Sequence, residues 1–178
     1  MVQLIIDGVN YLNSLDGIQH CVALKYLMIN NISELGGIDP LSQCENLSIV
    51  RINNCERLWK VDTLDNLTQL EHLDLGGCRN IEFIGFNKVH DKLVTLALGD
   101  CLKLSKISFV KKCPNLEDIY LFNCGKIESV KDLLFCPNLI SVKILAMKIK
   151  PEEKDLLRSN LHGLVDSTIK YNFSISYN

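Results

Sequence analysis

The sequence lacks an excess of charge of either sign. Its 178 residues carry 19 Lys and Arg against 21 Asp and Glu, which gives a formal net charge of −2. Without a basic surplus, the chain as a whole has no electrostatic attraction to nucleic acid or to anionic lipid. We therefore expect neither nucleic acid nor a membrane among its partners.

Long hydrophobic runs are also missing. Apolar stretches such as 4–6 and 94–98 end within a few residues, whereas a membrane-spanning helix needs roughly 20 apolar residues. Residues 1–7 contain no basic segment, no long apolar core and no small-residue cleavage site, so they do not resemble a secretory signal. The sequence predicts a cytoplasmic chain that does not cross a membrane.

Motifs that would hold a metal or a cofactor are absent as well. None of the eight cysteines belongs to a Cys-x-x-Cys pair, the spacing from which zinc sites usually take their ligands. Gly76 and Gly77 do not lie between a strand and a helix, as a phosphate-binding loop would. We expect no metal and no cofactor.

What the sequence does contain is a frame that recurs every 23 residues. It is clearest in Leu70-x-x-Leu73-x-Leu75-x-x-Cys78, where apolar residues hold positions one, four and six and a cysteine holds position nine. Seven repeats follow one another without insertion or deletion, starting at residues 1, 24, 47, 70, 93, 116 and 139. A fixed internal period of this length is typical of a solenoid, so residues 1–178 are predicted to form a single repeat domain.

The frame resembles that of the leucine-rich-repeat family, which has Asn or Cys at position nine. Four repeats carry Cys there, and Cys-Pro-Asn at 113–115 and 136–138 is similar to the cysteine-containing subclass found in F-box substrate receptors. The resemblance covers about residues 1 to 150. It implies an α/β solenoid, a curved right-handed superhelix with a parallel β-sheet on its concave face, and a non-catalytic module that binds a protein partner.

The residue pattern agrees with this fold. Alternation at positions four and six predicts a short strand with one face buried. Elsewhere in each repeat, apolar residues lie three apart, as in Leu58, Val61 and Leu64, a spacing that favours 3₁₀ turns on a thin convex side. The fourth repeat has Asn87 and His90 where this pattern expects apolar residues, so we expect a rearranged path there.

The frame fails after residue 147, where a cap is expected. Residues 150–163 begin with Lys-Pro-Glu-Glu and end in Gly, which predicts a helix with start and stop signals. Residues 168–175 alternate apolar with polar and predict a final strand. Together, about residues 150–178 would cap the end of the solenoid, as terminal repeats require.

The cysteines have a structural explanation in the repeat. Position nine is occupied by Cys55, Cys78, Cys101 and Cys124, and position twenty-one by Cys21, Cys44, Cys113 and Cys136. Side chains at equivalent positions point the same way, which does not suit disulfide geometry. We expect buried, free thiols that behave as small hydrophobic groups.

Candidate binding residues lie at the outward positions of the strands, which vary in chemistry from repeat to repeat. One predicted patch comprises Tyr26, Met28, Ile49 and Arg51, and another Tyr120, Phe122, Lys143 and Leu145. Tyr, Met, Phe and Arg are enriched at protein interfaces. Between the patches we expect an acidic middle, which would bind a basic segment of the partner. It is formed by Asp74, Asp100, Glu117 and Asp118, with His72 nearby.

Two alternatives remain open. The chain could be the substrate-recognition or regulatory subunit of a larger complex, of the ubiquitin-ligase or phosphatase type. It could also be an enzyme that uses the neighbourhood of His72 and Asp74, although a solvated acidic patch explains these residues as well.

Overall fold

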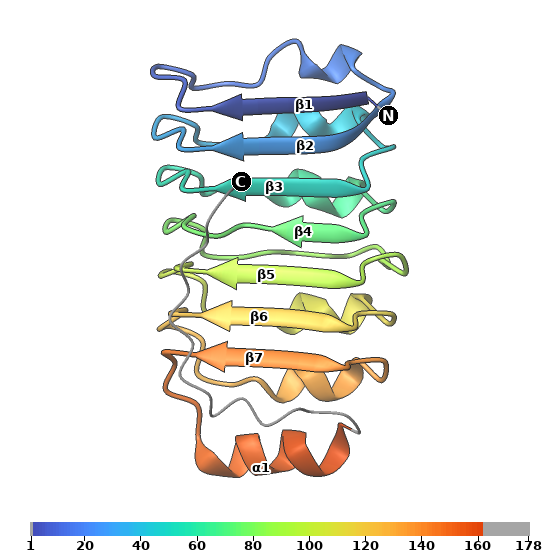
Figure 1. The fold of residues 1–178 in the computed structure, drawn as a ribbon, viewed down its shortest axis with the longest axis vertical. Helices are drawn as coiled ribbons and strands as arrows, with labels where there is room; N and C mark the ends of the chain where they lie inside the picture. The colour runs from blue at the N-terminus through green and yellow to red at the C-terminus, as the bar shows by residue number, and fades with distance from the viewer. Residues whose placement is uncertain (1, 162–178) are drawn as a thin grey trace.

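Residues 2–161 are described in the computed structural model, in which seven parallel strands form one sheet in chain order (Figure 1). Neighbouring strands pair at equivalent positions of successive repeats, 23 residues apart. The predicted leucine-rich-repeat solenoid is therefore confirmed. The strands are β1 (Val2–Asp7), β2 (Leu24–Asn30), β3 (Ile49–Asn53), β4 (His72–Asp74), β5 (Thr95–Gly99), β6 (Asp118–Phe122) and β7 (Ser141–Leu145).

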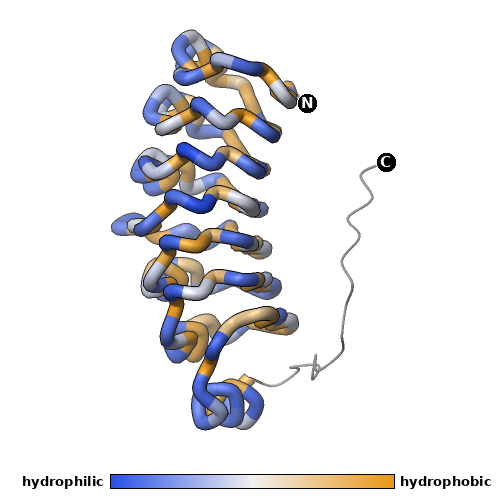
Figure 2. The backbone as a smooth tube through the Cα atoms, turned by 90° about the vertical axis from the view of Figure 1, so that its left-hand side faces the viewer, coloured by the Kyte–Doolittle hydropathy of each residue, from blue (hydrophilic) through white to orange (hydrophobic). Residues whose placement is uncertain are grey.

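The stack of repeats is nearly straight. Figure 2 shows the turns lying one on another, with hydrophobic and hydrophilic residues alternating along each turn. The backs of the repeats are thin, so they need little more room along the stack than the strand spacing of about 4.8 Å. The predicted concave surface is thus an almost flat one, and we call it the sheet face.

The interior is built from the inward positions of each strand. Leu27 and Ile29 on β2 are fully buried, as period-2 alternation requires. Three of the four cysteines at position nine add a hydrogen bond to this packing, because their thiols donate to a carbonyl of the preceding repeat, whereas the Cys55 thiol donates to Asn53 of its own repeat. Cys78 donates to the Ile52 oxygen at 3.2 Å. Cys101 likewise donates to the Leu75 oxygen at 3.2 Å, and Cys124 donates to the Leu98 oxygen at 3.3 Å.

Seven of the eight free cysteines are buried, but Cys21 is exposed. The prediction of a buried thiol is wrong at this position. In the next repeat, the Cys44 thiol packs on the preceding turn and donates to the Ile18 carbonyl at 3.2 Å. Cys21 belongs to the first repeat, and within residues 2–161 no earlier turn exists to cover it.

The back of the solenoid consists of short 3₁₀ helices, as predicted. They are η1 (Ile18–His20), η2 (Asp39–Gln43), η3 (Asp62–Asn66), η4 (Ser108–Lys112) and η5 (Lys131–Phe135). The starts of η2, η3, η4 and η5 follow the 23-residue period with one gap between η3 and η4. No helix begins at residue 85, where the fourth repeat should have one. The expected rearrangement of this repeat is confirmed.

The C-terminal end of the stack is closed by helix α1 (Pro151–Asn160). Its Glu153 side chain is buried and accepts hydrogen bonds from the Val130 N–H at 2.9 Å and the Ser129 hydroxyl at 3.0 Å. Leu157 packs into the core. The predicted helix of the cap is thus confirmed, whereas the predicted strand at 168–175 lies outside the described residues.

Candidate functional site

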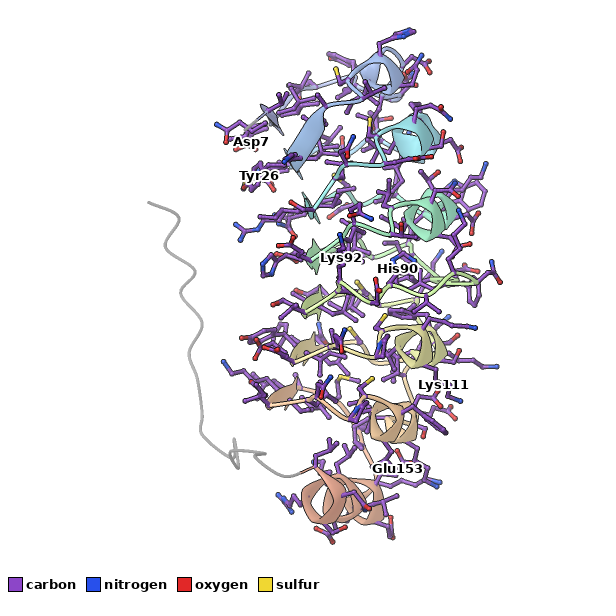
Figure 3. All side chains as sticks on the ribbon, turned by 90° about the vertical axis from the view of Figure 1, so that its right-hand side faces the viewer. Asp7, Tyr26, His90, Lys92, Lys111 and Glu153 are labelled. Carbon is purple, nitrogen blue, oxygen red and sulfur yellow. The ribbon has the colours of Figure 1, made fainter. Side chains whose placement is uncertain are left out.

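The register of the sheet gathers the outward side chains into continuous columns. Position three places Tyr26, Ile49, His72, Thr95 and Asp118 side by side, and position five does so for Met28, Arg51, Asp74, Ala97, Tyr120 and Lys143. Figure 3 shows Tyr26 on the sheet side and Lys111 on the opposite side, with His90 between them. The predicted binding residues at positions three and five therefore share one face, together with Phe122 and Leu145 at position seven.

The first group of these residues, on β2, β3 and β4, forms what we call the N-terminal patch. It comprises Tyr26, Met28, Ile49, Arg51, His72 and Asp74. The Tyr26 hydroxyl lies 3.5 Å from the Met28 sulfur, and Ile49 is the register partner of Tyr26. The patch thus presents an apolar, polarizable surface bordered by charges.

The charges of this patch are set opposite one another but are not joined. Arg51 and Asp74 are register partners on adjacent strands, yet in the described part of the chain they form no ion pair. The Gly76 N–H donates to two acceptors at once. The Asp74 carboxylate and the Asn53 amide oxygen each lie 3.0 Å from it. Burial raises the pKa of Asp74, and the Gly76 N–H and the Arg51 charge offset this only in part. Both charges therefore retain capacity for an external partner.

His72 and Asp74 share the face but are not coupled as catalytic groups would be. No hydrogen bond joins them among residues 2–161, and strand β5 lies between His72 and Asp118, a separation of about 10 Å, or two strand spacings. Asp100 belongs to a turn with φ of 51° and accepts the Asn123 amide at 2.6 Å. The predicted acidic middle is therefore dispersed over several strands and is not a single cluster.

A second group of residues on β6 and β7 forms the C-terminal patch, comprising Asp118, Tyr120, Phe122 and Lys143. The Lys143 ammonium lies 4.7 Å from the centre of the Tyr120 ring, a cation–π contact. Phe122 is 45% exposed and lies beside Gly99 of β5. An aromatic surface with one cation is thus held at this end of the face.

Between the two patches lies a strip of small side chains. The outward positions of β5 are Thr95, Ala97 and Gly99, none of which projects far from the backbone. The sheet face therefore consists of two patches of large side chains, separated by a strand whose outward side chains are small. A side chain from a partner could be seated over β5 and contact both patches.

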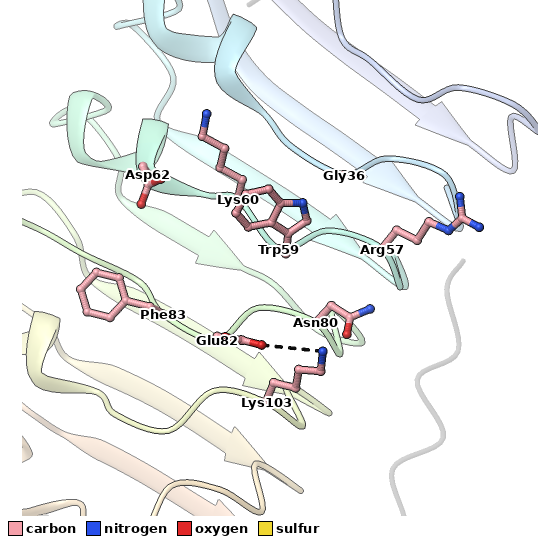
Figure 4. A pocket seen from close by; sticks show the side chains of 9 residues that line it. All are labelled: Gly36, Arg57, Trp59, Lys60, Asp62, Asn80, Glu82, Phe83 and Lys103. Carbon is pink, nitrogen blue, oxygen red and sulfur yellow. Dashed lines mark ion pairs between the residues drawn. The ribbon is translucent and has the colours of Figure 1, made fainter.

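A surface groove that the sequence did not predict lies near the ends of the strands, at the side of repeats two to five (Figure 4). It measures about 700 Å³, and Trp59 and Phe83 line it with exposed rings. Its Lys60 and Lys103 pair with Asp39 at 3.0 Å and Glu82 at 3.7 Å. The single Trp of the chain was the only sequence signal for this groove. Because its lysines are already paired, it offers fewer free groups than the sheet face.

Between residues 2 and 161, no three or more His, Cys, Asp or Glu side chains are placed to hold a metal ion. Within the same range, no helix has the length and hydropathy needed to cross a membrane.

Two solved structures to which the chain is similar come from bacteria. No family model matches the sequence, and no curated protein matches it. An internalin from Listeria monocytogenes is 20% identical with a TM-score of 0.49, over 93% of this chain and 59% of the internalin. A leucine-rich-repeat protein from Leptospira interrogans is 12% identical with a TM-score of 0.32, over 91% and 59%.

This chain therefore spans 59% of the length of each of those two structures. The assignment of the leucine-rich-repeat fold rests on its own 23-residue frame and on the register of the seven strands.

Proposed function

From this leucine-rich-repeat fold we propose that the chain is a non-catalytic module that binds a protein partner on its sheet face. The observation that carries the proposal is the contrast between the two sides of each strand. Inward positions stay apolar in every repeat, whereas outward positions change from Tyr and Met to Arg, Asp, Ala and Lys. A constant core supports the fold, and a varied surface provides specificity.

The chemistry of the face suggests how a partner would bind. The N-terminal and C-terminal patches contribute Tyr26, Met28, Tyr120 and Phe122, residue types that dominate the energetics of interfaces. A bulky side chain of the partner would seat over β5, between the patches. Charged groups of the partner would meet Arg51 and Asp74, which are left unpaired with each other.

The cellular setting and the larger assembly follow as parts of the same proposal. Seven buried free thiols suit a reducing compartment such as the cytoplasm. A role as the recognition or regulatory subunit of a ubiquitin ligase or phosphatase would use the same face, and the Cys-Pro-Asn segments support that alternative. We do not favour an enzyme at His72 and Asp74, because no hydrogen bond couples the two side chains.

The test compares two quadruple variants in affinity capture from the lysate of the source cell. The face variant carries Tyr26→Ala, Arg51→Ala, Tyr120→Ala and Phe122→Ala. The matched control carries Trp59→Ala, Arg79→Ala, Phe83→Ala and Phe135→Ala, which remove similar exposed side chains elsewhere. Both should keep the circular dichroism spectrum of the wild type.

We expect the face variant to lose a partner that the wild type and the control retain. Truncation of several central interface residues costs about 2 kcal/mol or more for each strong contributor, enough to abolish capture. Ubiquitin-ligase or phosphatase subunits among the retained proteins would identify the larger assembly. Loss with the control alone would move the binding site to the surfaces that carry these four side chains, the groove at Trp59 among them, and refute the sheet face.

A further inference from the structure

The first repeat differs from all the others in how much apolar surface it leaves uncovered. On β1, Leu4 and Ile6 are only partly buried, whereas their equivalents Leu27 and Ile29 on β2 are fully buried. Four of the chain's exposed large apolar side chains lie within ten residues, with exposures of 51%, 55%, 44% and 89% for Val2, Ile5, Val9 and Tyr11. The opposite end of the stack is covered by α1.

The backbone of β1 also presents unpaired groups. In this sheet, positions three, five and seven direct their backbone polar groups toward the preceding strand. For example, the His72 N–H donates to the Ser48 oxygen at 3.1 Å, and the Ala97 and Asn53 oxygens accept the Leu75 and Asn31 N–H groups, both at 3.0 Å. Within residues 2–161 no strand precedes β1. The corresponding groups of Gln3, Ile5 and Asp7 therefore point to the edge of the described sheet, where residues 2–161 supply no partner strand.

We propose that this edge is a homodimer interface, in which β1 pairs antiparallel with β1 of a second copy of the chain. A two-fold axis perpendicular to the sheet would pass through Ile5. Ile5 then faces Ile5 of the second copy, Gln3 faces Asp7 of the second copy, and Leu4 faces Ile6 of the second copy. Outward-pointing groups of Gln3, Ile5 and Asp7 meet their counterparts in hydrogen-bonding register.

The residues of β1 make this self-pairing chemically consistent. Directly opposed residues in an antiparallel pair lie on the same side of the sheet, so Leu4 and Ile6 of both copies complete one shared interior. Asp7 is the single charge of β1, and the register sets it against an amide and not against another carboxylate. The edge carries no Pro, no Lys and no bulge at its centre, which are the devices that usually prevent such pairing.

The geometry also limits the assembly to two chains. An isologous interface uses the same patch on both copies and closes on itself. The contact uses the β1 edge of both copies, so neither copy keeps a free β1 edge, and α1 packs against η5 at the other end of the stack. The sheet faces of the two copies would then lie on the same side of a continuous sheet.

The test measures molar mass by light scattering and sedimentation for the wild type and for matched variants. We expect the wild type at tens of micromolar to have the mass of two 20.1 kDa chains. Ile5→Lys places two cations directly opposite each other and should weaken association by about tenfold or more, to the monomer mass. Ile140→Lys changes an isoleucine of similar exposure, 58% against 55%, at the other end of the stack, and should leave the dimer intact.

A mixing experiment distinguishes the loss of the interface from a loss of folding. Ile5→Lys and Ile5→Glu proteins should each be monomeric alone and should form a mixed dimer when combined, because the opposed charges then attract. A wild type of monomer mass at 100 µM would overturn the proposal. A dimer that Ile5→Lys leaves unchanged, or a mixture that stays monomeric, would overturn it as well.

Discussion

The back of the fourth repeat fills the same space as the backs of the third and fifth, but with different residues. In the third and fifth repeats, η3 and η4 direct Leu64 and Val110 into the interior. In the fourth repeat no regular helix forms over residues 79–90, which we call the fourth segment. There Phe86 is buried and stacks on His90, with ring centres 3.8 Å apart.

The backbone amides of the fourth segment are satisfied from the neighbouring repeat. The Asn87 and Lys88 N–H groups donate to the Asp65 carboxylate at 2.7 and 2.9 Å. In the other repeats, the 3₁₀ helix itself supplies partners of this kind. The stack therefore requires a filled interior and paired backbone amides, but it does not require any particular helix.

The largest effect on stability is expected from removing the buried aromatic ring of the fourth segment. Phe86→Ala removes a buried ring that also meets Phe109 edge-on, with ring centres 5.2 Å apart. We expect the free energy of unfolding to fall by about 3–5 kcal/mol, the usual cost of deleting a buried Phe. Urea denaturation at pH 7.5 measures the change.

Phe83→Ala provides the matched control, since Phe83 lies three residues earlier and is 58% exposed. It should change the stability by no more than about 0.5 kcal/mol. Equal losses for the two variants would contradict the view that Phe86 replaces the missing 3₁₀ helix.

A smaller effect is expected from removing the carboxylate that holds the fourth segment. Asp65→Ala leaves the Asn87 and Lys88 amides without their partner, which should cost about 1–3 kcal/mol. Hydrogen–deuterium exchange should at the same time accelerate over residues 87–90. Asp62→Ala, an exposed carboxylate in the same 3₁₀ helix, should alter neither measurement, and protection that persists in Asp65→Ala would refute this role.

The strands, their register and the inward positions could be predicted from the sequence because a constant 23-residue period leaves one way to stack them. The parity of each strand position likewise placed Tyr26, Arg51 and Tyr120 on one face. Exposure of Cys21 could not be predicted from the frame, since it depends on which neighbouring turn covers the side chain.

The contacts between side chains on the sheet face could not be predicted from the sequence either. Position eight adopts a left-handed turn in which Asp100 binds Asn123, so a carboxylate counted as part of an acidic surface belongs to a turn. The groove at Trp59 arises because residues 23 apart meet at the side of the stack, where Gly36 leaves room beside the indole. Such effects depend on local side-chain size and not on the repeat pattern.

The smallest predicted effect concerns the pH dependence that His90 of the fourth segment confers. Burial lowers the pKa of His90, although the Asp65 carboxylate 3.8 Å away raises it in part. Among residues 2–161, neither ring nitrogen has a hydrogen-bond partner. The folded state therefore prefers the neutral ring, while the unfolded chain takes up a proton near its ordinary pKa of about 6.5. Stability is complete above that pH and declines as the pH falls toward the lowered folded-state pKa.

Urea midpoints at pH 7.5, 6.5, 5.5 and 5.0 would measure this decline, whose slope for one proton cannot exceed about 1.4 kcal/mol per pH unit. The range stays above the ordinary titration of carboxylates near pH 4, so Asp65 does not contribute. His90→Leu should flatten the profile, because leucine suits the apolar interior, whereas His72→Leu on the sheet face should leave the slope as it is. Stability that rises on acidification would mean that the protonated ring pairs with Asp65 strongly enough to outweigh its burial, which reverses the assignment.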